Sequence, residues 1–282
     1  MSVINKAIPS VDGKGLMLGR KGYTDDLAER NSLIVKVLRS PHPFAKIVNI
    51  NYEKAQEVLG VELILTHKDF KRNSFTRAGQ GYPEPSPHDK FVLDEYVRHI
   101  GDEVACVAAR TEKQCIEALK LIDVEYELLE PVLDFEQAID NTNLVHPEDG
   151  IYEMFPIGFE PKRNIAASYH MEVGNVEEDL KQSEVVLKQS FYTQAQAHAM
   201  LEPHTVNARL DYQDRLVLYS STQTPIHVRR ILSQTLEVPL SRIRVIKPRV
   251  GGGFGGKQAL HGEMLVSAVT LRTGKPSKMI YT

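Results

Sequence analysis

The sequence predicts a mixed α+β protein with two domains, and three observations support this prediction. The chain has 282 residues, of which 42% are hydrophobic, so it can bury a sizeable core and is long enough for two domains. Short apolar runs bounded by turn residues recur in both halves of the chain, as expected of β-strands. Between several of these runs, apolar residues return at helical spacing, which predicts helices among the strands.

The first half begins with a glycine-rich lead-in, followed by an apolar run at residues 33–38 that predicts a buried strand. Turn residues at 40–43 end this strand. Residues 53–59 have a short helical pattern, and residues 61–66 alternate as a second strand. Three prolines fall within residues 79–89, so this stretch is predicted to be a loop.

A strand–helix–strand unit follows the loop. Residues 104–108 are an apolar run, Thr111 can cap a helix, and the apolar residues of 115–122 fall on one helical face. Residues 124–128 then alternate as another strand. Weak periodicity and several turn residues come next, so we predict a first domain at 1–131, a linker at 132–164 and a second domain at 165–282.

In the second domain, apolar runs predict strands at residues 187–193, 205–210 and 216–220. Thr224 offers an N-cap and Pro225 a first helical residue for a helix that ends before Pro239. The last two predicted elements are a strand at 243–246 and a helix at 260–271, which Gly274 and Pro276 terminate.

Composition excludes several classes of function. Lys and Arg number 34 against 37 Asp and Glu, so the net charge of -3 does not favour nucleic acid or an anionic membrane as a partner. Cys106 and Cys115 are too few for an iron–sulfur cluster, and their apolar surroundings predict two buried thiols in a reducing compartment. Residues 1–9 lack the apolar core of a signal peptide, and no apolar stretch is long enough to span a bilayer, so a cytoplasmic location is expected.

The most unusual segment is a glycine-rich loop at residues 251–257, Gly-Gly-Gly-Phe-Gly-Gly-Lys, between the last predicted strand and helix. Five glycines in six residues are entropically costly, which indicates that another group comes close to this backbone. Loop amides and a helix N-terminus suit an anion or an oxygen-rich cofactor. Seven basic residues lie nearby, although a tight turn beside a solvated basic face is the alternative: Arg229, Arg230, Arg242, Arg244, Lys247, Arg249 and Lys257.

Two short nucleotide-binding motifs match the loop but lack their supporting residues. A P-loop needs Ser or Thr after its lysine, and Gln258 stands there instead. A dinucleotide-binding GxGxxG needs an acidic residue about 20 positions further on, and residues 264–282 contain none. His198, Glu202 and His204 could be written as metal ligands, but their spacing is not that of HExxH and Pro203 would interrupt a shared helix.

At this loop the sequence resembles the molybdenum-binding subunit of the xanthine dehydrogenase and aldehyde oxidase family, in which GGGFGGK follows a Ser-Thr-Gln strand end, here residues 221–223. The order in which residues 200–203, residues 221–223, the next helix and the glycine loop follow one another is also similar to the order in that family. The first half resembles the α/β-hammerhead domain of that family in four short segments: 11–14, 23–26, 38–42 and 97–103. The resemblance implies an α+β fold, a hammerhead domain followed by the first, incomplete part of a molybdopterin-binding domain.

The resemblance also assigns roles to single residues, with no side chain binding the metal directly. Gln223 matches the glutamine that hydrogen-bonds an oxygen ligand of molybdenum, and its alternative is a strand-end residue that caps the next helix. Gln258 stands where xanthine-type members have a purine-binding Glu, so it either bonds a substrate heteroatom or caps the following helix. Backbone amides beside the metal centre are expected from Gly252, Gly253, Phe254 and Gly255.

The resemblance implies hydroxylation of an N-heterocycle such as a purine, or of an aldehyde, with water as the oxygen source. The expected cofactor is molybdenum–molybdopterin, in a dinucleotide form, with iron–sulfur clusters and FAD on partner chains or domains. The catalytic base of the family is a Glu beyond this chain, so the chain is expected to need the rest of the molybdenum subunit, an iron–sulfur subunit and an FAD subunit. The alternatives are a non-catalytic assembly or scaffold module of the same fold, and an NTP-binding protein.

Overall fold

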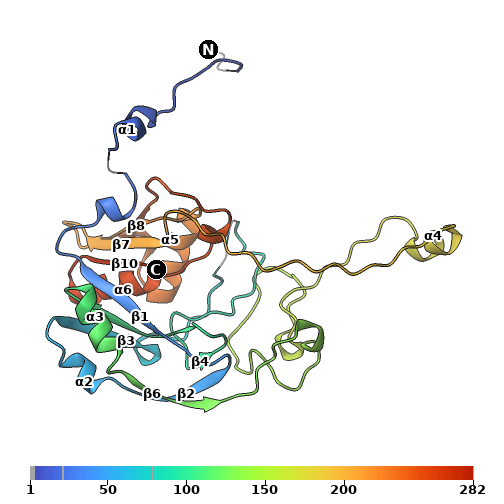
Figure 1. Cartoon of the computed structure of the whole chain (residues 1–282), viewed down its shortest axis with the longest axis horizontal. Coiled ribbons are helices and arrows are strands. Elements are labelled where there is room, and N and C mark those ends of the chain that lie inside the picture. The colour runs from blue at the N-terminus through green and yellow to red at the C-terminus, as the bar shows by residue number, and fades with distance from the viewer. Residues whose placement is uncertain (1–3, 21, 78, 80, 282) are drawn as a thin grey trace.

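The computed structural model describes residues 4–20, 22–77, 79 and 81–281, and within them it contains a seven-stranded and a three-stranded β-sheet (Figure 1). In spatial order, the larger sheet consists of β3 (Val61–Thr66), β5 (Glu103–Ala109), β1 (Leu33–Arg39), β10 (Ser277–Ile280), β7 (Thr205–Leu210), β8 (Leu216–Ser220) and β9 (Ile243–Ile246). The smaller sheet consists of β4 (Tyr96–Val97), β2 (Ala45–Asn51) and β6 (Asp123–Leu128).

The helices differ widely in length, and α5 and α6 are the two longest in the described part of the chain. In chain order they are α1 (Gly13–Met17), α2 (Glu53–Gln56), α3 (Glu112–Leu119), α4 (Val176–Gln182), α5 (Pro225–Leu236) and α6 (Glu263–Thr273). Six short 3₁₀ segments accompany them: Asp25–Leu27, His67–Asp69, Phe135–Gln137, Pro161–Arg163, Leu240–Arg242 and Gly256–Gln258. Among the described residues, none of these helices is both long and apolar enough to cross a membrane.

The larger sheet joins the two halves of the sequence. β1 pairs antiparallel with β5 on one side and parallel with β10 on the other, with Leu33 opposite Ser277. β10 in turn pairs antiparallel with β7, and β8 pairs parallel with β9. The first long strand of the chain and its last strand are therefore neighbours.

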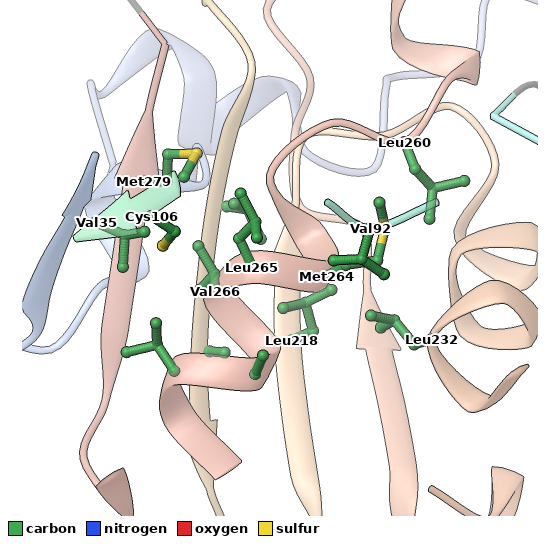
Figure 2. Packing of buried hydrophobic residues seen from close by; sticks show 14 of the residues in the cluster. Val35, Val92, Cys106, Leu218, Leu232, Leu260, Met264, Leu265, Val266 and Met279 are labelled. Atoms are coloured by element: carbon green, nitrogen blue, oxygen red, sulfur yellow. The ribbon is translucent and has the colours of Figure 1, made fainter. Parts of the chain in front are cut away.

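Two hydrophobic clusters cover opposite faces of this sheet, because side chains alternate between the faces of a strand. On one face, Leu265 and Val266 of α6 pack against Leu218 and Met279 of the strands (Figure 2). On the other face, α3 and the smaller sheet pack on β1 and β5. Residues 104–109 of β5 are fully buried, which explains the uninterrupted apolar run in the sequence.

Most predicted elements are confirmed at or near their expected positions. The predicted helix before Pro239 is α5, with Pro225 as its first residue, although Thr224 makes no side-chain capping bond to it. The helix predicted at 260–271 begins later, at Glu263, and the one predicted at 53–59 is shorter. Strands lie where the sequence predicts them at 33–38, 61–66, 104–108, 205–210, 216–220 and 243–246. At its described positions, the proline-containing stretch 79–89 has neither helix nor strand, and Gln80 lies outside the described residues.

The strand predicted at 187–193 is wrong. These residues are extended, but no strand in the described chain lies beside them to share backbone hydrogen bonds. Leu187 and Phe191 are 82% and 83% exposed. The segment belongs to an arm that carries α4 and projects from the body of the molecule (Figure 1). Its apolar pattern is typical of a strand, but a strand also needs a pairing partner.

Both cysteines are buried and free, as their apolar surroundings predict. Burial raises the pKa of the Cys115 thiol to about 11 and raises the pKa of Cys106 still further. Both side chains therefore stay protonated at neutral pH and act as small apolar residues.

Thr111 caps α3 as predicted, and the cap is a reciprocal one. Its hydroxyl accepts a hydrogen bond from the Gln114 amide, while the Gln114 side chain accepts one from the Thr111 amide. We expect Thr111→Ala to lower the free energy of unfolding by about 1 kcal/mol, because the Gln114 amide would lose its acceptor. Urea denaturation measures this change. Thr193→Ala, at an exposed position in the arm, is the control, and equal losses in the two variants would contradict the prediction.

Candidate functional site

The glycine loop at residues 251–257 lies between β9 and α6, as the sequence predicts. Gly252 and Gly255 have φ values of 96° and 89°, which side-chain-bearing residues rarely adopt. Phe254 also has a positive φ of 50°, although it is not glycine, and its ring is 74% exposed. A strained, exposed aromatic residue in a glycine loop is typical of a functional position.

Gln223 lies directly against this loop, shortly after the end of β8. Its amide donates to the Lys257 carbonyl at 2.8 Å, and its side-chain Oε1 accepts from the Gly255 amide at 3.2 Å. These bonds fix the carboxamide and leave the Nε2 hydrogens without an acceptor among the residues that the structure describes. Gln223 is therefore not a cap of the following helix, and it presents a neutral donor beside the loop.

The absence of side chains on the loop is what allows this close approach. A Cβ atom at Gly253 would lie 2.6 Å from Gln223 Oε1, and one at Gly256 would lie 2.9 Å from the His198 ring. A Cβ atom at Gly255 would meet nothing within 4 Å, so the loop is open on that side. The glycines thus serve both to seat Gln223 and to leave backbone accessible.

An ion pair beneath the loop was not predicted from the sequence. The Lys257 side chain is completely buried, and its Nζ lies 2.8 Å from Glu202 Oε2. The same carboxylate oxygen accepts from the Gly251 amide at 2.7 Å. The sequence patterns suggest Glu202 as a possible metal ligand and Lys257 as a basic residue of the loop, so neither pattern indicates that the two residues pair.

The metal-ligand interpretation of His198, Glu202 and His204 is wrong for the described chain. Glu202 is paired with Lys257, while the His204 ring contacts the His261 ring, tilted by 47° and with centroids 3.8 Å apart. No group of three His, Cys, Asp or Glu residues among those described could hold a metal ion.

Burial lowers the pKa of both His204 and His261 to about 4, well below the ordinary 6.5. The pKa of His204 is lowered further by the neighbouring His261, and that of His261 by Arg77. The unfolded chain therefore binds protons at these rings more readily than the folded chain does. Their contribution to stability is complete above pH 6.5 and is lost as the pH falls from about 6.5 to about 4.

We accordingly expect the melting temperature to fall between pH 7 and pH 4, and the fall to be smaller when His204 and His261 are both replaced by Gln. Other buried histidines, such as His88, also have a lowered pKa, so part of the fall should remain. Differential scanning fluorimetry at several pH values measures the slope. His170→Gln, at an exposed position, is the control, and a double variant with the parent's slope would count against the prediction.

Several of the seven basic residues near the loop make contacts within the chain. Arg229 donates to the carbonyls of Leu240 and Ile243, and Arg230 pairs with Glu84. Arg249 pairs with Asp12, and Lys257 is buried with Glu202. The local charge therefore does not by itself indicate an anion site, and the case for a ligand rests on the loop and Gln223.

The structure brings together Gln223 and the expected loop positions, Gly252, Gly253, Phe254 and Gly255. Gln258 lies at the end of the same loop, where its amide donates to the Gly255 carbonyl and its carbonyl accepts from Thr224 Oγ1. The N-cap position of α6 belongs to Gly262, so Gln258 does not occupy it.

A bare glycine loop joined to a strand-end glutamine, beside a domain with a second sheet, is the arrangement that the family resemblance implies for a molybdenum-cofactor protein. Residues 18–130 match the family model described as aldehyde oxidase and xanthine dehydrogenase, a/b hammerhead domain, and residues 159–282 match the molybdopterin cofactor-binding domain. The chain belongs to the xanthine dehydrogenase and aldehyde oxidase family of molybdenum hydroxylases. The predicted α+β fold, a hammerhead domain followed by a molybdopterin-binding domain, is confirmed.

The chain is also similar to individual members of this family. The chain is 34% identical to "Probable hypoxanthine oxidase XdhD" of Escherichia coli (strain K12), covering 100% of this chain and 32% of the relative. It is 30% identical to the nicotinate dehydrogenase large molybdopterin subunit of Eubacterium barkeri, covering 99% and 61%. The solved quinoline 2-oxidoreductase of Pseudomonas putida 86 is 26% identical, with a TM-score of 0.77, covering 99% of this chain and 34% of that one. The chain spans about a third of the length of the first curated relatives.

Proposed function

We propose that this chain is part of a molybdenum-dependent hydroxylase that inserts an oxygen atom from water into an electron-poor carbon of an N-heterocycle. Three relatives are named for hypoxanthine, nicotinate and quinoline, and all three compounds are nitrogen heterocycles. Aldehydes are the second substrate class, because relatives named aldehyde oxidase match at 29% identity. Gln258 in place of a Glu favours a neutral heteroatom as the group that this position binds.

The residues at the loop fit molybdenum–molybdopterin, which carries oxygen ligands on its metal and many polar atoms on its pterin. Gln223 Nε2 is a neutral donor suited to an oxygen ligand, and the backbone of residues 252–255 is bare enough to lie beside a bulky group. Glu202 Oε1 is buried and has no partner among the described residues, so a donor is needed there. This combination of an unused donor, bare backbone and an unpaired buried acceptor is the observation that supports the proposal.

In this function the residues of the chain bind and orient, while the cofactor supplies the oxidation chemistry when it is bound. Gln223 would hold an oxygen ligand in one orientation without adding charge, and Phe254 would shield the same side from water. Gln258 would hydrogen-bond the substrate. In this proposal the pterin has a dinucleotide form, the general base lies on a further segment, and the iron–sulfur and FAD carriers lie on partner chains or domains.

The same proposal includes the division into a domain at 1–131, a linker at 132–164 and a second domain at 165–282, and a cytoplasmic location. The location is supported by the two free cysteines, which stay reduced in such a compartment.

The test is to purify the assembled protein, measure its molybdenum content by mass spectrometry, and assay it with hypoxanthine, nicotinate, quinoline and an aldehyde. We expect bound molybdenum and turnover of at least one heterocycle. Gln223→Leu should keep the metal and lower kcat by roughly 10²-fold, because one oriented donor is lost. Gln213→Leu, in an exposed turn, should change neither.

Two results would contradict the proposal. Assembled protein that contains no molybdenum would favour the scaffold module of the same fold instead. Undiminished turnover in Gln223→Leu, with the metal still bound, would remove Gln223 from the site.

A further inference from the structure

The buried pair of Glu202 and Lys257 is poorly explained as a source of stability. Lys257 is 0% exposed and Glu202 12% exposed, so both charges have lost most of their hydration. A buried ion pair of this kind contributes little or nothing to stability compared with apolar residues of similar size. The pair is better explained by the way it holds the glycine loop in place.

The pair fixes the glycine loop at both ends. At the first end, the Glu202 carboxylate accepts from the Gly251 amide at 2.7 Å, and the Glu202 amide donates to the Gly251 carbonyl at 3.1 Å. At the other end, Lys257 reaches the same carboxylate oxygen at 2.8 Å. One carboxylate oxygen thus holds the two ends of the loop together.

The ion pair of Glu202 and Lys257 is also linked by hydrogen bonds to Gln223. The Lys257 carbonyl accepts from the Gln223 amide at 2.8 Å and from Thr222 Oγ1 at 3.3 Å. Gln223 Oε1 then accepts from the Gly255 amide at 3.2 Å, which closes a ring of bonds through the loop. A shift of Lys257 would therefore move the Gln223 carboxamide relative to the loop amides.

We propose that Glu202 and Lys257 are positioning residues, whose ion pair sets the distance between Gln223 and the glycine loop and so prepares the loop for its ligand. The proposal rests on the proposed function for the identity of that ligand, molybdenum–molybdopterin. It does not rest on that function for the order of the loop, which can be measured without cofactor.

The decisive variant is the double replacement Glu202→Leu/Lys257→Met, which removes both charges and keeps apolar volume. We expect its melting temperature to stay within a few degrees of the parent's, since the lost pair adds little stability. Deuterium uptake of the peptide covering residues 251–258 should nevertheless quicken about tenfold, because the loop opens more often. The molybdenum content of the assembled protein should fall several-fold, because more of the binding free energy is then needed to order the loop.

Two further variants separate charge from hydrogen bonding. Glu202→Gln keeps an acceptor for the Gly251 amide and for Lys257, so it should retain most of the loop's protection from exchange. The exchanged pair Glu202→Lys/Lys257→Glu restores opposite charges but offers Gly251 no acceptor, so it should not restore protection. The control is Lys90→Met/Asp102→Asn, which removes another partly buried pair, 3.2 Å apart and away from the loop.

Unchanged exchange at residues 251–258 in the Glu202→Leu/Lys257→Met variant would overturn the proposal, as would full protection in the exchanged pair. If the parent protein held no molybdenum, the proposed function would fail, and loop exchange alone would decide on the positioning role. A general loss of protection across the whole chain, with a much lower melting temperature, would identify a purely structural pair and also overturn it.

Discussion

Replacing Gly253 by Val is expected to lower turnover by roughly 10³-fold in the assembled enzyme, together with most of the bound molybdenum. Even the first side-chain atom would lie 2.6 Å from Gln223 Oε1 and 2.8 Å from its Cδ, so the carboxamide must swing away. That movement breaks its bond with the Gly255 amide, and the two methyl groups fill space beside the loop backbone. Turnover assays and metal analysis on the same preparation measure both effects.

The fold should survive this change, because Gly253 does not have the positive φ of its neighbours and the displaced atoms are the flexible end of a side chain. Gly81→Ala is the matched control, since a Cβ atom there meets nothing within 4 Å. A Gly253→Val protein that kept parental turnover and metal would show that no ligand needs this backbone to be bare.

Leu265→Ala is expected to cause the largest loss of stability among single truncations considered in this chain, about 2–5 kcal/mol of unfolding free energy. Leu265 is 0% exposed in α6, where it packs within the cluster that covers one face of the larger sheet (Figure 2). The helix is buried along most of its length, so the surrounding residues have little freedom to fill the cavity. Urea denaturation followed by circular dichroism gives the change in free energy.

Ile226→Ala provides the comparison, because Ile226 is a 66% exposed residue of the neighbouring helix α5. It should cost less than about 0.5 kcal/mol. Similar losses in the two variants would mean that α6 is not the core helix that the structure describes.

The glycine loop and its surrounding elements could be predicted because their signals are local. Five glycines between a strand and a helix indicate a bare backbone wherever the strand and helix lie in the fold. Gln223 could be assigned only through the family resemblance, since a glutamine at a strand end has no distinctive spacing. The structure then excludes the capping interpretation, because the side chain bonds the Gly255 amide instead.

The pair of Glu202 and Lys257 could not be predicted, because 55 positions separate its members along the chain. Its formation depends on how β7, β8 and the loop are placed in the sheet, and no periodicity encodes that placement. The prediction of a strand at 187–193 failed for a different reason. Its local pattern is that of a strand, but pairing is a property of two segments, and the described chain offers it no second one.

The place of β10 determines when the protein can finish folding during its synthesis. Ser277–Ile280 inserts between β1 and β7, so the backbone groups that these strands direct toward it stay unpaired until the ribosome has released residues near 280. A nascent chain would expose two strand edges for all that time, and such edges pair readily with other chains. A sheet whose middle strand is translated last among its described members therefore closes only late in synthesis.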